Sequence, residues 1–260
     1  MRLSASLTGA AGAPVLVLGN SLGTTSELWR PQLAALEARF RLLRYEHRGH
    51  GGSPAPPGPY SIADLGTDVL GLLDHYEIET ARYCGVSLGG MVGMWLAANA
   101  PARIGALALC CTSARLSPAQ MWTDRAALVR SAGTGSIARQ VVGRWFTPAF
   151  ADRHPAAVAG CVTTLEEQVA AEGYAGCCEA IAAMDLRPLL GSVTARTLVI
   201  AGADDPATPP RHGALIAAAI PGAGLRVIRG AAHLANVSQA AEVTAALVAH
   251  LVPDPGRARS

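Results

Sequence analysis

The amino-acid sequence predicts an α/β protein with a mostly parallel central sheet flanked by helices and with a helical cap inserted into it. Short apolar runs of strand length alternate with helix-like segments on both sides of a central region, and this alternation is typical of parallel sheets. The central region is helix-like and has no clear strand. Half of the 260 residues are apolar, which suffices for one large core. We therefore expect a core of residues 1–113 and 187–252, a cap of residues 114–186 and a tail of residues 253–260.

The first half of the core alternates strand and helix along the chain. Residues 14–20 are a short apolar run that predicts a central strand, residues 41–47 are predicted as a second strand, and residues 26–40 between them carry leucines at helical spacing. A loop dense in glycine and proline follows, and Ser61 with Asp64 three residues later then resembles a capping box at the start of a helix. The remaining elements predicted here are a helix over 61–78, a strand over 81–86, a helix over 88–101 whose small residues allow close packing, and a strand over 104–113.

The same pattern returns after the cap. Residues 194–205 regain strand character, and residues 209–220 show helical spacing. A strand leading into a loop is expected over 224–233, and a closing helix over 236–252. The proline- and arginine-containing tail, 253–260, is predicted to be disordered or a linker.

Composition and charge exclude several classes of function. The formal net charge is +2 and no basic run is present, so we expect no nucleic-acid partner. No apolar stretch reaches the ~18 residues of a membrane-spanning helix, and the amino-terminal apolar run is too short for a signal peptide, so we expect no membrane association. The six cysteines show no CxxC spacing, which favours a reduced, cytoplasmic protein without a structural metal site.

One serine stands between glycines at the end of a predicted strand. The run Gly85-Val86-Ser87-Leu88-Gly89 has the G-x-S-x-G spacing of a nucleophile elbow, in which the serine occupies a strained turn from strand to helix. Such a turn exposes the hydroxyl, and the dipole of the following helix favours the negative charge that develops there. An ordinary turn serine is the alternative, and the strand and helix predicted around Ser87 favour the nucleophile.

A serine hydroxyl needs a base that is itself oriented by an acid. With an elbow of this kind the chain order is serine, acid and histidine, each on a loop after a strand. Of the seven histidines, only His233 follows a late predicted strand in that order. An earlier predicted strand ends at Asp204 and Asp205, and we expect Asp205, next to Pro206, to be the acid, with Asp204 capping the turn or solvated. The predicted catalytic residues are Ser87, Asp205 and His233.

The tetrahedral intermediate of acyl transfer requires two hydrogen-bond donors. One should be the backbone N–H of Leu88, directly after the nucleophile. The other should come from the loop after the first central strand, where we expect the Leu22 amide, with Gly23 allowing the backbone to approach closely. A simple glycine turn is the alternative for this loop.

Taken together, these segments resemble the α/β-hydrolase superfamily and, more narrowly, the 3-oxoadipate enol-lactonases. The elbow and the Arg-Gly-His-Gly loop are general to the superfamily, whereas the Asn-Ser-Leu-Gly loop and the cap segments RWFTPAF and GYAGCCEAI are particular to the enol-lactonases. The resemblance covers most of the chain and implies an α/β-hydrolase fold. It also implies that Ser87, Asp205 and His233 form the triad and that Leu22 and Leu88 supply the oxyanion donors.

The resemblance further implies a small five-membered enol-lactone substrate that bears a carboxylate, opened without a metal ion or cofactor. Trp145, in RWFTPAF, is expected to line the substrate pocket. Arg125 and Arg144 are candidates for binding the substrate carboxylate, with solvated surface charges as the alternative, and Arg48 is expected to bond loop carbonyls beside the elbow. Assembly into a homo-oligomer is left open. Two rival functions also remain: another esterase, perhydrolase or C–C hydrolase with the same triad, and a non-catalytic binding protein on the same fold.

Overall fold

A seven-stranded sheet forms the centre of the protein. The computed structural model describes residues 1–252, and the predicted tail 253–260 lies outside them. The strand order is β1-β3-β2-β4-β5-β6-β7; β1 runs antiparallel to β3, and all other neighbours are parallel. The predicted mostly parallel architecture is confirmed. The strands are β1 (Ala5–Thr8), β2 (Val15–Gly19), β3 (Arg41–Tyr45), β4 (Ala81–Val86), β5 (Ile104–Cys110), β6 (Arg196–Gly202) and β7 (Gly224–Ile228).

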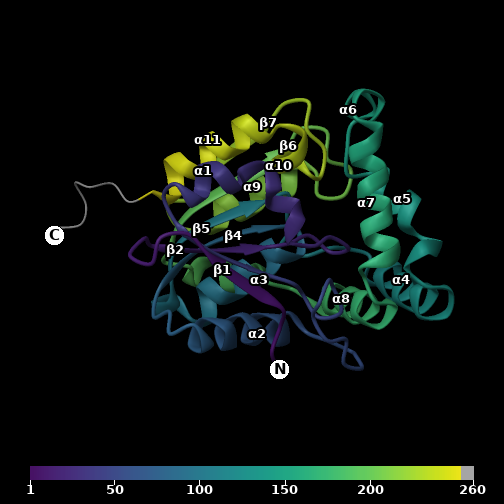
Figure 1. Cartoon of the computed structure of the whole chain (residues 1–260), viewed down its shortest axis with the longest axis horizontal. Helices are drawn as coiled ribbons and strands as arrows, with labels where there is room; N and C mark the ends of the chain where they lie inside the picture. The colour runs from purple at the N-terminus through teal and green to yellow at the C-terminus, as the bar shows by residue number, and fades with distance from the viewer. Residues whose placement is uncertain (253–260) are drawn as a thin grey trace.

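Helices cover both faces of the sheet (Figure 1). Helices α1 and α11 pack together on one face, and α2 and α3 pack together on the other. The central strands β4 and β5 are therefore buried along almost their whole length, as expected of parallel strands covered on both sides. The core helices are α1 (Leu33–Glu37), α2 (Ile62–His75), α3 (Leu88–Asn99), α9 (Pro210–Ala219), α10 (Ala235–Ser238) and α11 (Ala240–Leu251), with 3-10 segments η1 (Ser26–Gln32), η2 (Pro101–Arg103) and η4 (Arg187–Ser192).

The chain between β5 and β6 is helical and gathers at one side of the molecule, on the right in Figure 1. It corresponds to the predicted cap 114–186, whose division from the core stays a prediction. An antiparallel bridge between His50 and Val169 ties this region to the loop after β3, and the Ala170 amide donates to the Gly49 carbonyl at 2.8 Å beside it. The cap elements are α4 (Ala119–Ala132), η3 (Thr134–Ser136), α5 (Ala138–Val142), α6 (Pro148–Arg153), α7 (Pro155–Glu167) and α8 (Ala171–Ala183).

Three elements differ from the prediction, each for a local reason. The helix predicted over 26–40 is a 3-10 segment followed by the short α1, because Pro31 cannot donate the hydrogen bond of a continuous α-helix. The closing helix predicted over 236–252 is interrupted at Gln239, whose backbone leaves the helical region at φ −125° and ψ 49°, and forms α10 and α11. Strand β1 was not predicted: it has four residues, carries polar side chains and pairs only with β3.

Three further features of the described residues bear on the expectations from the sequence. Within residues 1–252, no helix is both long enough and apolar enough to cross a bilayer. All six cysteines are free thiols, and five of them are buried. The same part of the chain holds no cluster of three or more histidine, cysteine or carboxylate side chains suited to a metal ion.

Candidate active site

Ser87 forms a sharp turn between β4 and α3. Its backbone lies at φ 53° and ψ −112°, a region that L-residues rarely adopt and that stores strain. The next residue, Leu88, begins α3, so the Ser87 hydroxyl lies at a helix amino terminus, where the helix dipole favours negative charge. Only 8% of the Ser87 surface is exposed. The strand, strained turn and helix that the elbow pattern predicts are all present.

Glycines let this turn pack directly on neighbouring backbone. A Cβ atom on Gly89 would overlap the backbone of Gly19 at the end of β2, and a Cβ atom on Gly85 would overlap Gly89. From the other side, the Thr112 hydroxyl donates to the Ser87 carbonyl at 2.7 Å. The strained conformation of Ser87 is therefore held by close contacts that a residue with a side chain would prevent.

His233 lies in the loop after β7, and its ring is bonded to Asp205 in the loop after β6. The distance from His233 Nδ1 to Asp205 Oδ2 is 2.8 Å, and both side chains are buried. Asp205 Oδ1 accepts from the amides of Ala207 at 2.8 Å and Thr208 at 3.0 Å, while Oδ2 also accepts from the Thr208 hydroxyl at 2.7 Å. These bonds fix the carboxylate, and the carboxylate fixes the orientation of the imidazole.

The environment of Asp205 favours the ionised form. Burial by itself raises its pKa, but the charge and hydrogen bond of His233, together with the bonds from Thr208, outweigh burial and hold the pKa below its ordinary value. An ionised Asp205 accepts a hydrogen bond from the Nδ1–H of His233 and stabilises an imidazolium when one forms. The backbone amide of the neighbouring Asp204 donates to the Ala231 carbonyl at 2.9 Å. Of the two adjacent acids, the structure places Asp205 against the ring.

Ser87 and His233 line the same cavity, which has a volume of about 240 Å³. Within residues 1–252, the hydrogen bonds of the His233 ring run through Nδ1, to Asp205 and at 3.4 Å to Thr208, which leaves Nε2 for the cavity. No hydrogen bond joins Ser87 Oγ to this ring within the described residues, and the catalytic bond between a serine and its base often forms only when substrate binds. The structure thus brings the predicted nucleophile and base to one cavity, with the predicted acid behind the base.

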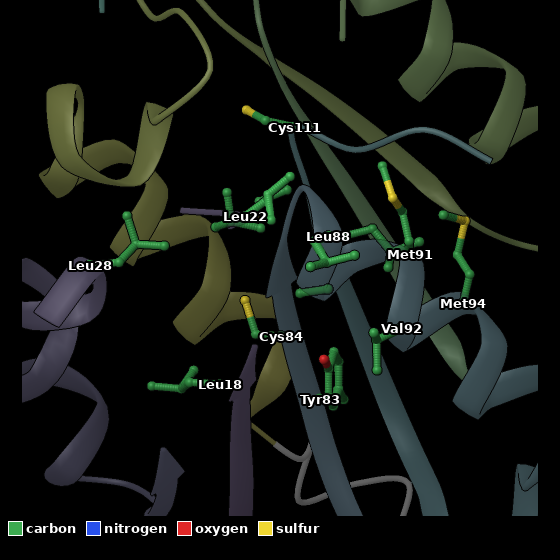
Figure 2. Close-up of a cluster of buried hydrophobic side chains, with 14 of the residues drawn as sticks. Leu18, Leu22, Leu28, Tyr83, Cys84, Leu88, Met91, Val92, Met94 and Cys111 are labelled. Atoms are coloured by element: carbon green, nitrogen blue, oxygen red, sulfur yellow. The ribbon is translucent and has the colours of Figure 1, made fainter. Parts of the chain in front are cut away.

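The Leu88 amide is the first N–H of α3, and the first N–H groups of a helix have no intrahelical acceptor. The amide that follows it, on Gly89, is already bonded, because it donates to the Asn20 carbonyl at 2.9 Å and joins the elbow to the loop after β2. Figure 2 shows the Leu88 side chain at the start of α3, with Leu22 of that loop nearby. Leu88 therefore has the position beside Ser87 that an oxyanion donor requires.

His50 holds the loop that carries Leu22, a role that the sequence pattern did not reveal. The Gly23 amide donates to His50 Nε2 at 3.0 Å, and His50 Nδ1 lies 2.9 Å from the Arg48 carbonyl. Because Nε2 accepts a hydrogen bond, Nδ1 carries the proton and the ring is neutral. The Gly23 amide is thus occupied by His50, and Leu22, the preceding residue of the same loop, lines the cavity.

Burial keeps this histidine neutral. Burial, followed by the neighbouring His47, lowers the pKa of His50 to about 3, and burial lowers the pKa of His47 to about 4. His47 Nε2 lies 2.9 Å from the Asn20 carbonyl. The Arg-Gly-His-Gly motif marks the loop in the sequence, but the partner of His50 is an amide 27 residues away, which no local pattern indicates.

Arg48 has a partner different from the one predicted. Its guanidinium forms two hydrogen bonds with the Asp68 carboxylate of α2, at 2.6 Å and 3.0 Å, and lies over the Tyr60 ring at 4.9 Å. The expected bonds to loop carbonyls beside the elbow are therefore wrong. A buried carboxylate outcompetes carbonyls for a guanidinium, since a charge-assisted bidentate pair is the stronger interaction.

Trp145 belongs to the cap wall of the cavity. It is 4% exposed, it lines the cavity together with Ser87, and its carbonyl accepts the amide of Leu234 at 3.0 Å. This position agrees with the pocket role predicted for Trp145, and its contact with substrate stays a prediction. The other cap residues between 122 and 174 on this wall are Trp122, Arg125, Val141, Arg144 and Tyr174.

Known proteins share both this fold and much of this sequence. Residues 14–132 match the family described as alpha/beta hydrolase fold. The chain is 43% identical to 3-oxoadipate enol-lactonase 2 of Acinetobacter baylyi over 231 residues, which cover 89% of this chain and 86% of that protein. It is 35% identical to 3-oxoadipate enol-lactonase 1 of the same organism over 237 residues, covering 91% and 88%. The crystal structure of the enol-lactonase from Burkholderia xenovorans LB400 matches with a TM-score of 0.94, at 42% identity and 96% coverage of both chains. The chain therefore belongs to the α/β-hydrolase family, and the 3-oxoadipate enol-lactonases are among its relatives.

Proposed function

We propose that this protein is a serine hydrolase that opens the ring of 3-oxoadipate enol-lactone to give 3-oxoadipate, a step of the β-ketoadipate route of aromatic breakdown. The observation that carries the proposal is the buried Asp205–His233 pair, 2.8 Å apart, beside the cavity that Ser87 also lines. The lactone is supported by two relatives named 3-oxoadipate enol-lactonases, at 43% and 35% identity.

In the first half of the reaction Ser87 Oγ attacks the lactone carbonyl while His233 Nε2 takes the serine proton. The ionised Asp205 stabilises the imidazolium that results. The amides of Leu22 and Leu88 hold the oxyanion of the tetrahedral intermediate. The ring oxygen leaves as an enolate, which is less basic than an ordinary alkoxide, and the proton that His233 returns to it gives the enol. The enol tautomerises to the ketone, and the acyl group stays on Ser87.

In the second half, His233 activates water to attack the acyl-enzyme, and 3-oxoadipate departs. Each proton passes through the same imidazole, so the mechanism needs no metal ion and no cofactor. The cavity of about 240 Å³ lies below the range of roughly 300–1,000 Å³ that accommodates drug-sized ligands, which supports a small-molecule substrate. The free, mostly buried cysteines favour a reducing, cytoplasmic location.

Turnover of the enol-lactone by the wild type and by Ser87→Ala tests the proposal. We expect kcat to fall by a factor of about 10⁴–10⁶, because nucleophile and base act as one unit. Ser131→Ala, at an exposed cap serine, is the matched control and should keep wild-type activity. A Ser87→Ala protein that retains a tenth of the activity would overturn the nucleophile assignment.

The rival functions give different results with other probes. An esterase with the same triad would favour p-nitrophenyl acetate over the enol-lactone in kcat/KM. A non-catalytic binding protein would leave Ser87 unlabelled by a fluorophosphonate while the folded protein turns over neither substrate. We expect rapid labelling at Ser87 and a preference for the lactone.

A further inference from the structure

We propose that His212 is a second acid–base group of the cavity and carries the proton that converts the enol released by ring opening into the ketone. The proposal rests on the proposed function, which generates that enol. It adds a residue outside the triad and a catalysed step, the tautomerisation, for which neither Ser87 nor the oxyanion amides provide a proton carrier.

The position of His212 is the first argument. It lies in the first turn of α9, on the segment that follows the Asp205 loop. Two histidines line the catalytic cavity, His212 and His233, and Ala207 and Pro209 of the intervening segment line it as well. The cavity of about 240 Å³ is small. A substrate that contacts Ser87 and His233 in it therefore also has the His212 ring on its wall.

The hydrogen bonds of the ring are the second argument. Ser113 is buried after β5, and its hydroxyl donates to the Arg115 carbonyl at 2.6 Å. The same oxygen lies 2.7 Å from His212 Nδ1. Because the single hydroxyl proton is used on the carbonyl, Nδ1 of the ring carries the proton of this second bond. In the neutral ring Nε2 then has the lone pair, and it has no hydrogen-bond partner within residues 1–252.

The charge state of the ring is the third argument. Burial, followed by the charge of Arg211, lowers the pKa of His212, and the Asp205 carboxylate acts in the opposite direction. The ring is therefore neutral near pH 7, and it lies within the electrostatic range of Asp205. A neutral imidazole with a free Nε2 is able to accept a proton and to return it.

The chemistry of the product needs such a group. After ring opening the enol has its proton on oxygen, whereas the ketone has it on the neighbouring carbon of the former double bond. His212 Nε2 takes the enol proton, and the electron pair of the O–H bond forms the carbonyl. The imidazolium then gives the proton to the carbon, which binds it with the electron pair of the double bond. Protons and electrons balance, and His233 stays neutral for the attack of water on the acyl-enzyme.

Hydrogen–deuterium exchange in 3-oxoadipate tests His212 without any hydrolysis. A group that delivers a proton to a carbon also removes one from it, by microscopic reversibility. The hydrogens between the ketone and its nearer carboxylate are acidified by both groups and exchange without an enzyme. The readout is therefore the CH2 group on the other side of the ketone, followed by proton NMR in deuterium oxide. We expect wild type to accelerate this exchange, and His212→Gln and His212→Asn to lower the acceleration at least about tenfold.

Three further variants separate His212 from the triad and from its own support. His233→Gln should abolish ring opening and yet keep the exchange within about threefold of wild type. Ser113→Ala should slow the exchange severalfold, because the tautomer of the His212 ring is no longer fixed. His154→Gln, at an exposed histidine of the cap, is the matched control and should leave the exchange unchanged. Circular dichroism checks the fold of each variant.

The outcomes distinguish this proposal from the proposed function. Exchange that His233→Gln abolishes and His212→Gln retains would overturn the role of His212. A wild type that opens the lactone but does not accelerate the exchange would overturn the role of His212 alone. Exchange that depends on His212, in a protein that opens no lactone, would support the acid–base role and overturn the proposed function.

Discussion

The core and the cap contribute to the same cavity in opposite ways. On the core side, each group is already held by the chain: Ser87 by a strained turn packed on glycines, and Asp205 by three donors besides His233. On the cap side, the buried Nε of Arg144 and the buried indole Nε1 of Trp122 have no hydrogen-bond partner within residues 1–252. The predicted catalytic groups are thus preorganised by the fold, which is what electrostatic catalysis requires. The cap side of the cavity, by contrast, keeps buried donors that the described chain does not satisfy.

The comparison predicts that the largest effects on the reaction itself come from the core. Asp205→Asn should lower kcat about 10⁴-fold, because a neutral amide cannot stabilise the imidazolium or hold the required tautomer. Steady-state kinetics with the enol-lactone measure the loss, and circular dichroism checks the fold.

Asp204→Asn is the matched control for this experiment. The backbone amide of Asp204 donates a hydrogen bond to the Ala231 carbonyl, and a change of side chain leaves this bond in place. The substitution should therefore leave kcat within about threefold of wild type. Equal losses for Asp204→Asn and Asp205→Asn would show that the two neighbours share the role, against the geometry.

Buried histidines of the core predict a loss of stability in acid. The pKa values of His47 and His50 lie at about 4 and about 3 in the folded chain, below the ordinary 6.5. The unfolded chain therefore binds more protons than the folded one below pH 6.5, and the free energy of unfolding falls as the pH drops toward 4. Between pH 6.5 and 5 the loss is on the order of 2 kcal/mol per ring, at 1.36 kcal/mol per pH unit.

Urea unfolding at pH 7.5, 6.5 and 5 measures this loss. The raised pKa of the half-buried Glu46 acts in the opposite direction, because its folded form takes up a proton more readily than the unfolded chain. His154→Gln, at an exposed position of the cap, should leave the slope unchanged. A free energy of unfolding that stays constant from pH 7.5 to 5 would contradict the neutral state assigned to His47 and His50.

Glycines also differ between the core and the cap, since those of the elbow have no room for a side chain and some in the cap do. Gly89→Ala should destabilise the protein by about 1–3 kcal/mol, because the added methyl group meets the Gly19 backbone. Gly160→Ala, in the exposed part of α7, meets nothing within 4 Å and should stabilise the helix by up to about 1 kcal/mol. Thermal unfolding of both variants measures the difference, and a Gly89→Ala protein as stable as wild type would contradict the close packing of the elbow.

The difference between core and cap also explains what could be predicted from the sequence. The capping box is formed, with the Asp64 amide donating to Ser61 Oγ at 3.1 Å, because its two residues are three positions apart. The alternation of strands and loops likewise predicts the elbow and the order of Ser87, Asp205 and His233, and the structure brings these residues to one site. Their catalytic roles stay predictions.

The parts that could not be predicted depend on contacts between distant segments. His50 accepts a hydrogen bond from the Gly23 amide because two loops lie side by side, and β1 forms because it pairs with the edge of β3. In the cap, no pattern distinguishes Arg125, which lines the cavity, from Arg130, which is paired on the surface. The side of α4 that faces α8 and the cavity decides where each arginine lies, and that side is set by the packing of the two helices rather than by local sequence.

The smallest expected effect is the stability that the surface pairs of the cap provide. Arg130 binds Glu172 at 2.9 Å and also Glu179, both on α8, and about a third of its side chain is exposed to solvent. Solvent screens such pairs, so Arg130→Met should lower the free energy of unfolding by at most about 1 kcal/mol, and the difference from wild type should shrink in about 1 M salt. Arg139→Met, at an exposed arginine with no ion pair in the described chain, should change stability by less than about 0.5 kcal/mol at either salt concentration. A loss of several kcal/mol for Arg130→Met that salt does not reduce would contradict this prediction. It would mean that the packing of α4 on α8 depends on this ion pair as strongly as the core depends on its buried groups, and the core and the cap would then not differ in this respect.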